Sequence, residues 1–186
     1  MKDELYESEE TLAKIDEGLY KGCKRAISHE DMDSGVIIME EDPYSPDSIR
    51  LMDELSETLE FITGDSGRAS FDPSDVCVPR ALFIVARDEN GEAMGCGAIR
   101  PITEDIAELK RMYSKTKSIG VGTKMLAYLE SQAQKLGYST LWLETRLVNQ
   151  KAVSFYEGRG YQRINNYGKY QNNQKSVCLE KLLNNV

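Results

Sequence analysis

Apolar residues recur every three or four positions after Gly120, a spacing that indicates an amphipathic helix. The apolar positions that would share one face of this helix are Val121, Met125, Leu126, Leu129, Ala133 and Leu136. Gly137 follows them directly, and a glycine at that point commonly ends a helix in the left-handed conformation. The pattern therefore predicts a helix from Gly120 to the residue before Gly137.

The segment before this helix, residues 107–113, resembles a strand that carries charged residues where a core strand would be apolar. Leu109 and Met112 are three residues apart, so both can face one core only if a β-bulge interrupts the alternation. A strand, a short glycine loop and a helix N-terminus together present free backbone amides, which attract anions. We therefore expect a bulged strand that leads into an anion-binding loop.

Periodic segments along the rest of the chain predict a mixed α/β fold. Further strands are expected at residues 35–39, 82–87, 93–102, 141–145, 161–164 and 176–179, and further helices at 49–62 and after 149. Asn90-Gly91 supplies a hairpin turn between two of these strands. Gly95 and Gly97 mark places where a neighbouring backbone comes close. Residues 64–79 are expected to be a long irregular segment.

Charge is unevenly distributed along the 186 residues, whose formal net charge is −8. The first 67 residues hold 19 acidic and 6 basic side chains, whereas residues 68–186 hold 12 acidic and 17 basic ones. The basic surplus around the glycine loop suits a polyanionic cofactor, and the acidic first part suits a cationic substrate or serves only solubility. This balance does not favour nucleic acid as a partner.

Two further classes of protein are disfavoured by the sequence. No apolar run approaches the roughly 18 residues that a membrane span needs, and the N-terminus has no signal-peptide core, so a cytoplasmic location is expected. The four cysteines have no Cys-x-x-Cys spacing and the chain has one histidine, so no metal site is expected. Cys96 and Cys178 lie in apolar runs and are expected to be buried thiols.

The glycine spacing limits which anion the loop can hold. A dinucleotide fingerprint would need a third glycine at position 125, where the chain has Met, and a P-loop would need four residues between its glycines. The pattern that remains is Lys117-Ser118-Ile119-Gly120-Val121-Gly122. It resembles the coenzyme A loop of the GNAT acetyltransferases, Gln/Arg-x-x-Gly-x-Gly/Ala. Lys117 and Ser118 replace the usual Arg-Gly, a departure that bears on cofactor affinity more than on the fold.

A second motif resembles the same family. An apolar strand at residues 141–145 precedes Asn149, Ala152, Tyr156-Glu157 and Gly160-Tyr161, which is similar to the family's Asn-x-x-Ala-x-x-x-Tyr-Glu-x-x-Gly-Phe/Tyr. The resemblance covers residues 35–182 and implies the GNAT acyl-CoA N-acyltransferase fold, a mostly antiparallel sheet flanked by helices. We expect this domain to span residues 35–186, after an acidic extension of residues 1–34.

The resemblance implies transfer of the acetyl group of acetyl-CoA to a primary amine of a small molecule or amino-acid-like acceptor. It also implies a cofactor site in which backbone groups near the bulge pair with the pantetheine arm and the loop amides hold the pyrophosphate. The residues that it implies for this site are Met112, Tyr113, Ser114, Lys117, Ser118, Ile119, Gly120, Val121, Gly122, Thr123, Asn149 and Tyr156. A backbone amide near Met112 would polarise the thioester carbonyl.

Two side chains are the candidates for proton transfer. Tyr156 could return a proton to the leaving thiolate, because a phenol with a reference pKa near 10 matches a thiolate of similar basicity. The alternative for Tyr156 is an ordinary packing role on a helix. Glu108 could accept the proton of the amine, and its alternative is an ion pair with Lys110, Arg111 or another base.

The sequence leaves the acceptor and two other functional classes open. Candidate residues for the acceptor pocket are Phe71, Arg111, Tyr167 and Tyr170. The chain could instead be a catalytically silent coenzyme A-binding sensor, or an interaction protein whose acidic first 67 residues dock a basic partner. The apolar pattern from Leu12 to Ile27 could cover the core or form a subunit interface in a homodimer.

Overall fold

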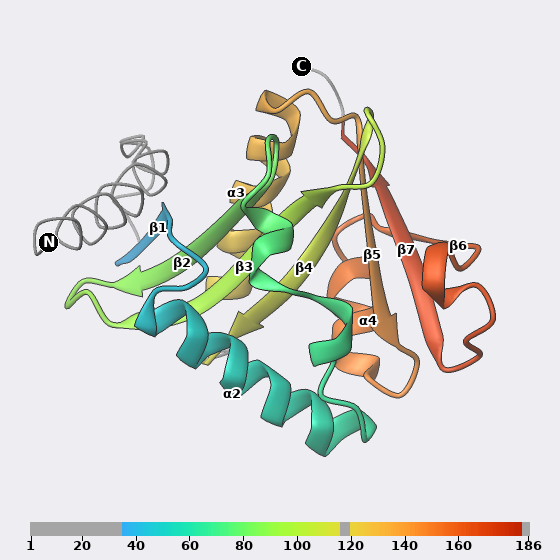
Figure 1. Ribbon diagram of the computed structural model, residues 1–186, viewed down its shortest axis with the longest axis horizontal. Helices are drawn as coiled ribbons and strands as arrows, with labels where there is room; N and C mark the ends of the chain where they lie inside the picture. Colours follow the sequence, from blue (N-terminus) through green and yellow to red (C-terminus); the bar gives the residue numbers. More distant parts are fainter. Residues whose placement is uncertain (1–34, 116–119, 184–186) are drawn as a thin grey trace, which may run out of the picture.

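The computed structural model describes residues 35–115 and 120–183, which form a seven-stranded sheet flanked by helices (Figure 1). The order of the strands in the sheet is β1-β2-β3-β4-β5-β7-β6. The strands are β1 (Val36–Glu40), β2 (Leu82–Asp88), β3 (Ala93–Pro101), β4 (Ile106–Ser114), β5 (Thr140–Arg146), β6 (Gln162–Ile164) and β7 (Ser176–Leu182). The helices are α2 (Pro46–Thr63), α3 (Val121–Lys135) and α4 (Gln150–Glu157), with short 3₁₀ turns η1 (Arg68–Ser70), η2 (Pro73–Val76) and η3 (Gly168–Tyr170).

All neighbouring strands are antiparallel except β4 and β5, which run parallel. Helix α2 covers one face of the sheet, while α3 and α4 cover the other (Figure 1). The expected mixed and mostly antiparallel fold is confirmed. The segment at residues 64–79 is less irregular than expected, because η1 and η2 lie within it. The extension at residues 1–34 lies outside the described residues.

Helix α2 buries only part of the face that its apolar pattern predicts, namely Leu51, Met52 and Leu55. Its buried residues are Ser48, Leu51, Met52, Leu55 and Ser56. Ile49 and Ile62, which were expected on this face, are 45% and 37% exposed. The hydroxyl of Ser56 donates to the carbonyl of Met52, so this buried polar group is satisfied within the helix. Two small serines on the packed face thus replace the two isoleucines.

Strand β4 contains the expected bulge. In the register with β3, Cys96 pairs with Tyr113 but Ala98 pairs with Lys110, so two residues of β4 lie opposite the single residue Gly97. One of these two, Arg111, has a positive φ of 52°. A Cβ atom on Gly97 would lie 2.6 Å from the sulfur of Met112, so this side chain would have to shift to make room for it.

The bulge lets Leu109 and Met112 pack in the same core, as their spacing predicted. The core on the α3 side also holds Met125, Leu129 and Leu141, and a smaller core on the α2 side holds Leu51, Phe83 and Cys96. Cys96 and Cys178 are both buried, which confirms the expectation for these thiols. The two cores fix β4 between layers on both faces.

Strands β4 and β5 pair over a short stretch and then separate. The paired residues are Ile106 with Thr140, Ala107 with Leu141 and Glu108 with Trp142. Beyond Glu108 the two strands diverge, and β5 continues beside β7 (Figure 1). The edge of β4 that faces β5 therefore lacks a partner in β5 from residue 109 onward, next to the bulge.

Candidate functional site

The N-terminus of α3 has the geometry of an anion-binding loop. Gly120 is the N-cap residue, with a φ of 66°, and no side chain caps the helix. The carbonyl of Gly120 accepts from the amide of Lys124, so the amides of Val121, Gly122 and Thr123 have no acceptor within the helix. A Cβ atom on Gly120 would meet nothing within 4 Å. Lys117, Ser118 and Ile119 lie outside the described residues.

Arg159 brings a permanent positive charge to this helix N-terminus. Its guanidinium donates hydrogen bonds to the hydroxyl of Thr123 and to the carbonyl of Phe155. The same guanidinium lies 3.8 Å from the centre of the Phe155 ring. Sequence reasoning missed Arg159, because it is 36 residues from Thr123 and its contact with α3 depends on how α4 packs.

Helix α4 begins at Asn149 and carries Tyr156 in the core that it shares with α3. The side chain of Asn149 accepts from the amide of Ala152, so it caps the helix. Tyr156 is 8% exposed, and its ring packs edge-on against Phe155 and Tyr161 at 5.1 and 5.4 Å. Burial raises the pKa of Tyr156 well above its ordinary value, so the phenol stays protonated at neutral pH.

The end of β4 carries the backbone groups expected to meet the pantetheine arm. Tyr113 and Ser114 pair with Cys96 and Gly95 of β3, so β3 occupies one edge of β4 here. A Cβ atom on Gly95 would lie 2.5 Å from the carbonyl oxygen of Tyr113, which explains the glycine. The opposite edge of β4 faces the divergence from β5 and is the one available to a ligand.

A cavity of about 710 Å³ lies on the α2 side of the sheet, where β4 begins to separate from β5. It is formed by η2, the end of β3, the start of β4 and η3. The residues that line it are Ser74, Asp75, Val78, Arg100, Pro101, Ile102, Glu108, Tyr167, Gly168, Lys169 and Tyr170. Segments from four parts of the chain thus meet beside Glu108.

Glu108 is 3% exposed and lies at the centre of a network of charges in this cavity. One carboxylate oxygen accepts from Nε and Nη2 of Arg100, at 2.9 and 2.7 Å. The other accepts from the hydroxyl of Tyr167 at 2.8 Å and lies 3.4 Å from Nζ of Lys110. Arg100 also donates to Asp75. Glu108 therefore forms ion pairs, and its catalytic role stays a prediction.

The groups around Glu108 titrate away from their ordinary values. Burial lowers the pKa of Lys110, and the charge of Glu108 opposes that shift. Burial, followed by the negative charge of Glu108, raises the pKa of both Tyr167 and Tyr170. Nζ of Lys110 donates to the hydroxyl of Tyr170 at 2.8 Å. Both phenols are thus held protonated beside the carboxylate.

Of the four residues proposed for the acceptor pocket, Tyr167 and Tyr170 line the cavity, and Phe71 and Arg111 are not among its lining residues. Phe71 is buried in the core on the α2 side, with the Arg111 guanidinium 5.3 Å from its ring centre. Arg111 donates to the carbonyl of Gly67, so it ties the bulge to the loop after α2.

Three lining residues of this cavity, Asp75, Arg100 and Lys169, were not predicted from the sequence. Arg100 lies directly opposite Glu108 in the register of β3 and β4, so a correct hairpin register could have identified it. Asp75 and Lys169 carry no such local signal, because they reach the cavity through long-range contacts.

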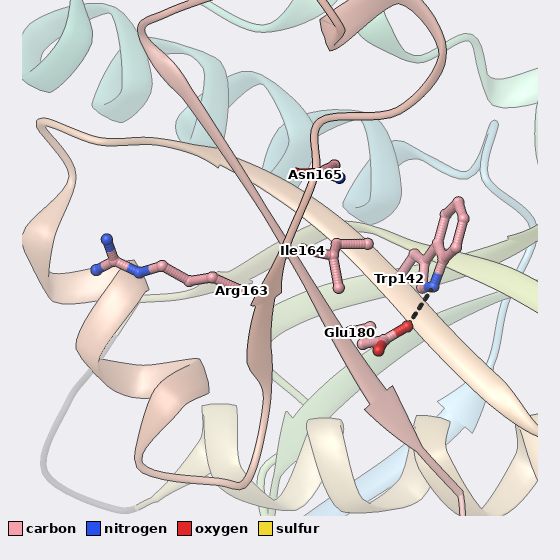
Figure 2. Close-up of a pocket in the computed structure, with 5 residues that line it drawn as sticks. All are labelled: Trp142, Arg163, Ile164, Asn165 and Glu180. Carbon is pink, nitrogen blue, oxygen red and sulfur yellow. Dashed lines mark hydrogen bonds between the residues drawn. The ribbon is translucent and has the colours of Figure 1, made fainter.

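A second cavity, of about 670 Å³, lies over β5, β6 and β7. It is lined by Trp142, Arg163, Ile164, Asn165 and Glu180, and Figure 2 shows Arg163 pointing away from the Trp142–Glu180 pair. The indole of Trp142 donates to Glu180 at 3.1 Å, and its ring centre lies 4.8 Å from that of Tyr167. Trp142 therefore separates this groove from the first cavity.

Two features are absent from the described part of the chain: a membrane-spanning helix and a cluster of metal-binding side chains. No helix there is long and apolar enough to cross a membrane. No group of three His, Cys, Asp or Glu side chains there is placed to hold a metal ion.

Comparison with known proteins places the chain in a family. The family model described as the acetyltransferase (GNAT) family matches residues 48–161, and the chain belongs to this family. An IAA acetyltransferase of Azospirillum brasilense is 30% identical over 151 residues, which cover 80% of this chain and 98% of that protein.

Solved structures agree with the family. A protein described as an acyl-CoA N-acyltransferase from Klebsiella pneumoniae is 29% identical, with a TM-score of 0.69 over 81% of this chain and 99% of that one. A GNAT family acetyltransferase from Elizabethkingia anophelis with acetyl-CoA bound has the same fold, with a TM-score of 0.61 at 15% identity over 80% of this chain and 99% of that one. The chain is therefore an acetyl-CoA-dependent acetyltransferase.

Proposed function

We propose that the chain transfers the acetyl group of acetyl-CoA directly to the primary amine of a small molecule. The observation that carries this proposal is the divergence of β4 from β5 beyond Glu108. It leaves the β5-facing edge of β4 without a partner in β5 from residue 109 onward, between the N-terminus of α3 and the charged cavity on the α2 side. A thioester lying along that edge would have its phosphates at the helix and its acetyl group towards the cavity.

The cofactor site that we propose uses mainly backbone groups. The amides of Gly120, Val121, Gly122 and Thr123 would hold the pyrophosphate, because a helix N-terminus favours negative charge. Lys117, Ser118 and Ile119 complete this loop in the sequence, and Arg159 adds a charge at Thr123. The backbone of Met112, Tyr113 and Ser114 would pair with the pantetheine arm, with Asn149 beside it.

The reaction needs a neutral amine, a polarised carbonyl and a proton for the departing thiolate. The amine nitrogen attacks the thioester carbon while the amide of Met112 stabilises the developing oxyanion. When the C–S bond breaks, the Tyr156 hydroxyl gives its proton to the thiolate, and the amine loses one proton to become an amide. Burial raises the pKa of Tyr156, which keeps the phenol protonated but makes it a weaker acid than a free phenol.

Glu108 is the proposed destination of the amine's proton, through a relayed water. Both of its oxygens already accept hydrogen bonds, from Arg100 and from Tyr167. Direct contact with an amine would require one of these bonds to break, whereas a water can bridge at low cost. The cytoplasmic location, the absence of a nucleic-acid partner and the homodimer stay predictions from the sequence.

Calorimetric titration with acetyl-CoA and with coenzyme A, followed by a thiol-release screen over primary amines, tests the proposal. We expect both ligands to bind, acetyl-CoA to raise the melting temperature, and at least one amine to release thiol with an acetylated product in the mass spectrum. Binding without release from any amine would favour the silent coenzyme A sensor. A melting temperature that does not change at millimolar acetyl-CoA would contradict the proposed function.

A further inference from the structure

We propose that the cavity beside Glu108 takes an amine that also carries a carboxylate, and that Lys169 binds this carboxylate. The proposal rests on the proposed acetyl transfer, and it names the class of acceptor. The proposal follows from the pairing of charges in the cavity, because one positive charge there has no carboxylate partner.

The two carboxylates that line the cavity are already neutralised. Arg100 forms ion pairs with both Asp75 and Glu108, and its side chain is 21% exposed. Its Nη2 atom also lies 3.4 Å from the carbonyl oxygen of Ser70. Because Arg100 spans the two acids, neither carboxylate meets a ligand as an isolated negative charge.

A second cation reinforces this neutralisation from within the protein. Lys110 is 8% exposed, and its Nζ atom lies 3.4 Å from Glu108 and 2.8 Å from the hydroxyl of Tyr170. Two carboxylates are therefore offset by two cations, of which Arg100 lines the cavity and Lys110 does not. An acceptor with several positive charges would find no unpaired carboxylate among the described lining residues, and it would meet Arg100 at close range.

Lys169 is the remaining charge at the cavity, and within the described residues it has no carboxylate within the 4.0 Å of an ion pair. Its Nζ atom donates to the carbonyl of Ala69 at 3.2 Å and lies 5.7 Å from the centre of the Tyr170 ring. An ammonium group has three donor hydrogens, so two remain for a ligand. This contact ties the Lys169 side chain to η1.

The rim of the cavity is apolar and exposed. Val78 and Ile102 are 42% and 38% exposed, and Pro101 lies beside them in the lining. An apolar side chain of the acceptor could cover this rim, while its carboxylate meets Lys169. The class of acceptor that fits these features is an amino acid, or a similar amino carboxylate, with an apolar side chain.

Matched acceptors that differ only in the carboxylate test this inference. The rates with leucine, phenylalanine and methionine are compared with those of the three corresponding decarboxylated amines, at saturating acetyl-CoA and fixed pH. We expect kcat/KM, calculated per neutral amine because the two ammonium groups differ in pKa, to favour at least one amino acid over its amine by about 10-fold or more, as expected for a charge-assisted hydrogen bond. The preference should shrink at high salt, because Lys169 is exposed.

A pair of lysine variants assigns the effect to one side chain. Lys169→Met should raise the KM for the preferred amino acid about 10-fold, leave its amine nearly unchanged and so remove the preference. Lys169→Arg should retain most of it. Lys175→Met, an exposed lysine in the same loop that does not line the cavity, is the control and should change neither acceptor. Equal effects of Lys169→Met and Lys175→Met would overturn the inference.

A binding measurement separates this inference from the proposed function. The N-acetylated form of each amino acid is titrated into the protein with coenzyme A present. Transfer to amines without any preference for the carboxylate, and without Lys169-dependent binding, would overturn the inference and leave the acetyl transfer intact. Binding that Lys169→Met weakens, with no transfer to any amine, would support the carboxylate site and contradict the transfer.

Discussion

The two regions that we assign to acetyl-CoA and to the acceptor, called here the cofactor side and the acceptor side, differ in the groups that form them. On the cofactor side, the features that we assign to acetyl-CoA are main-chain ones: the open Gly120, the uncapped start of α3 and the edge of β4 that has no partner in β5 beyond Glu108. On the acceptor side, the features are side chains from separate elements, with Arg100 and Glu108 at their centre and Asp75 and Lys169 around them.

This difference indicates which side can change most easily during evolution. We expect a site made of backbone amides to depend on glycine geometry more than on side chains such as Lys117 and Ser118, which stand in place of Arg-Gly. A site made of paired side chains changes its charge with one substitution, because each partner compensates another. We infer that members of this family can share the cofactor site and differ in the acceptor that they take.

The largest effect is expected from Tyr156→Phe, at the boundary between the two sides. The ring and its packing remain, so acetyl-CoA affinity should change little, while the proton donor is lost. General acid catalysis typically contributes ~10²–10⁴-fold, and kcat should fall by that order in a single-turnover assay. Because burial raises the pKa of Tyr156, the deficit should stay constant from neutral pH to the ordinary phenol pKa near 10.

Tyr161→Phe is the matched control for this prediction. Tyr161 packs 5.4 Å from Tyr156, but its hydroxyl donates to Glu130 on α3. Its loss should cost some stability and little turnover, since the removed hydrogen bond is structural. Full turnover by Tyr156→Phe, or an equal deficit in both variants, would show that Tyr156 is a packing residue.

A smaller effect, on stability, is expected on the acceptor side from Glu108→Gln. The glutamine can still accept from Tyr167, but Arg100 and Lys110 would lose the charge that offsets them. Removing one partner of a buried ion pair typically costs about 3–5 kcal/mol. The pKa of Lys110, which burial already lowers, should fall further, because Glu108 opposes that shift.

Urea denaturation measures this cost, with Asp53→Asn as the control. Asp53 pairs with Arg68 at 2.8 Å, but both side chains are more than half exposed. Such a pair is expected to contribute about 0–1 kcal/mol. If the two variants lose the same stability, the Glu108 network does not behave as a buried one.

The sequence predicts the cofactor side well because its signals are local. The spacing of Leu109 and Met112 predicts the bulge, and the residues around Gly120 predict the start of α3. Each of these depends on residues within one or two turns of the chain, where backbone geometry and residue type are directly linked.

The acceptor side is less predictable because it depends on tertiary packing. The apolar period of α2 points to Ile49 and Ile62, yet Ser48 and Ser56 lie on the packed face. Lys169 donates a hydrogen bond to the carbonyl of Ala69, which lies 100 residues earlier in the chain. No local sequence pattern predicts such a contact. Among the lining residues that sequence reasoning missed, Arg100 could have been identified from the strand register that pairs it with Glu108.

The smallest effects should come from two alanine substitutions in the cofactor loop. Gly120 has a positive φ of 66°, so Gly120→Ala should cost about 1–2 kcal/mol of stability. Its Cβ atom would enter the open space where we place the pyrophosphate, and acetyl-CoA affinity should fall about 10-fold, or about 1.4 kcal/mol.

Gly122 is helical, and its Cβ atom would lie 3.6 Å from the Phe155 ring, an ordinary contact. Gly122→Ala should therefore keep its stability or gain up to about 1 kcal/mol from helix propensity, with little loss of affinity. Calorimetric titration and thermal melts of both variants measure these changes. Equal losses of affinity would mean that the phosphates do not lie against Gly120, and the cofactor side would then depend on side chains as the acceptor side does.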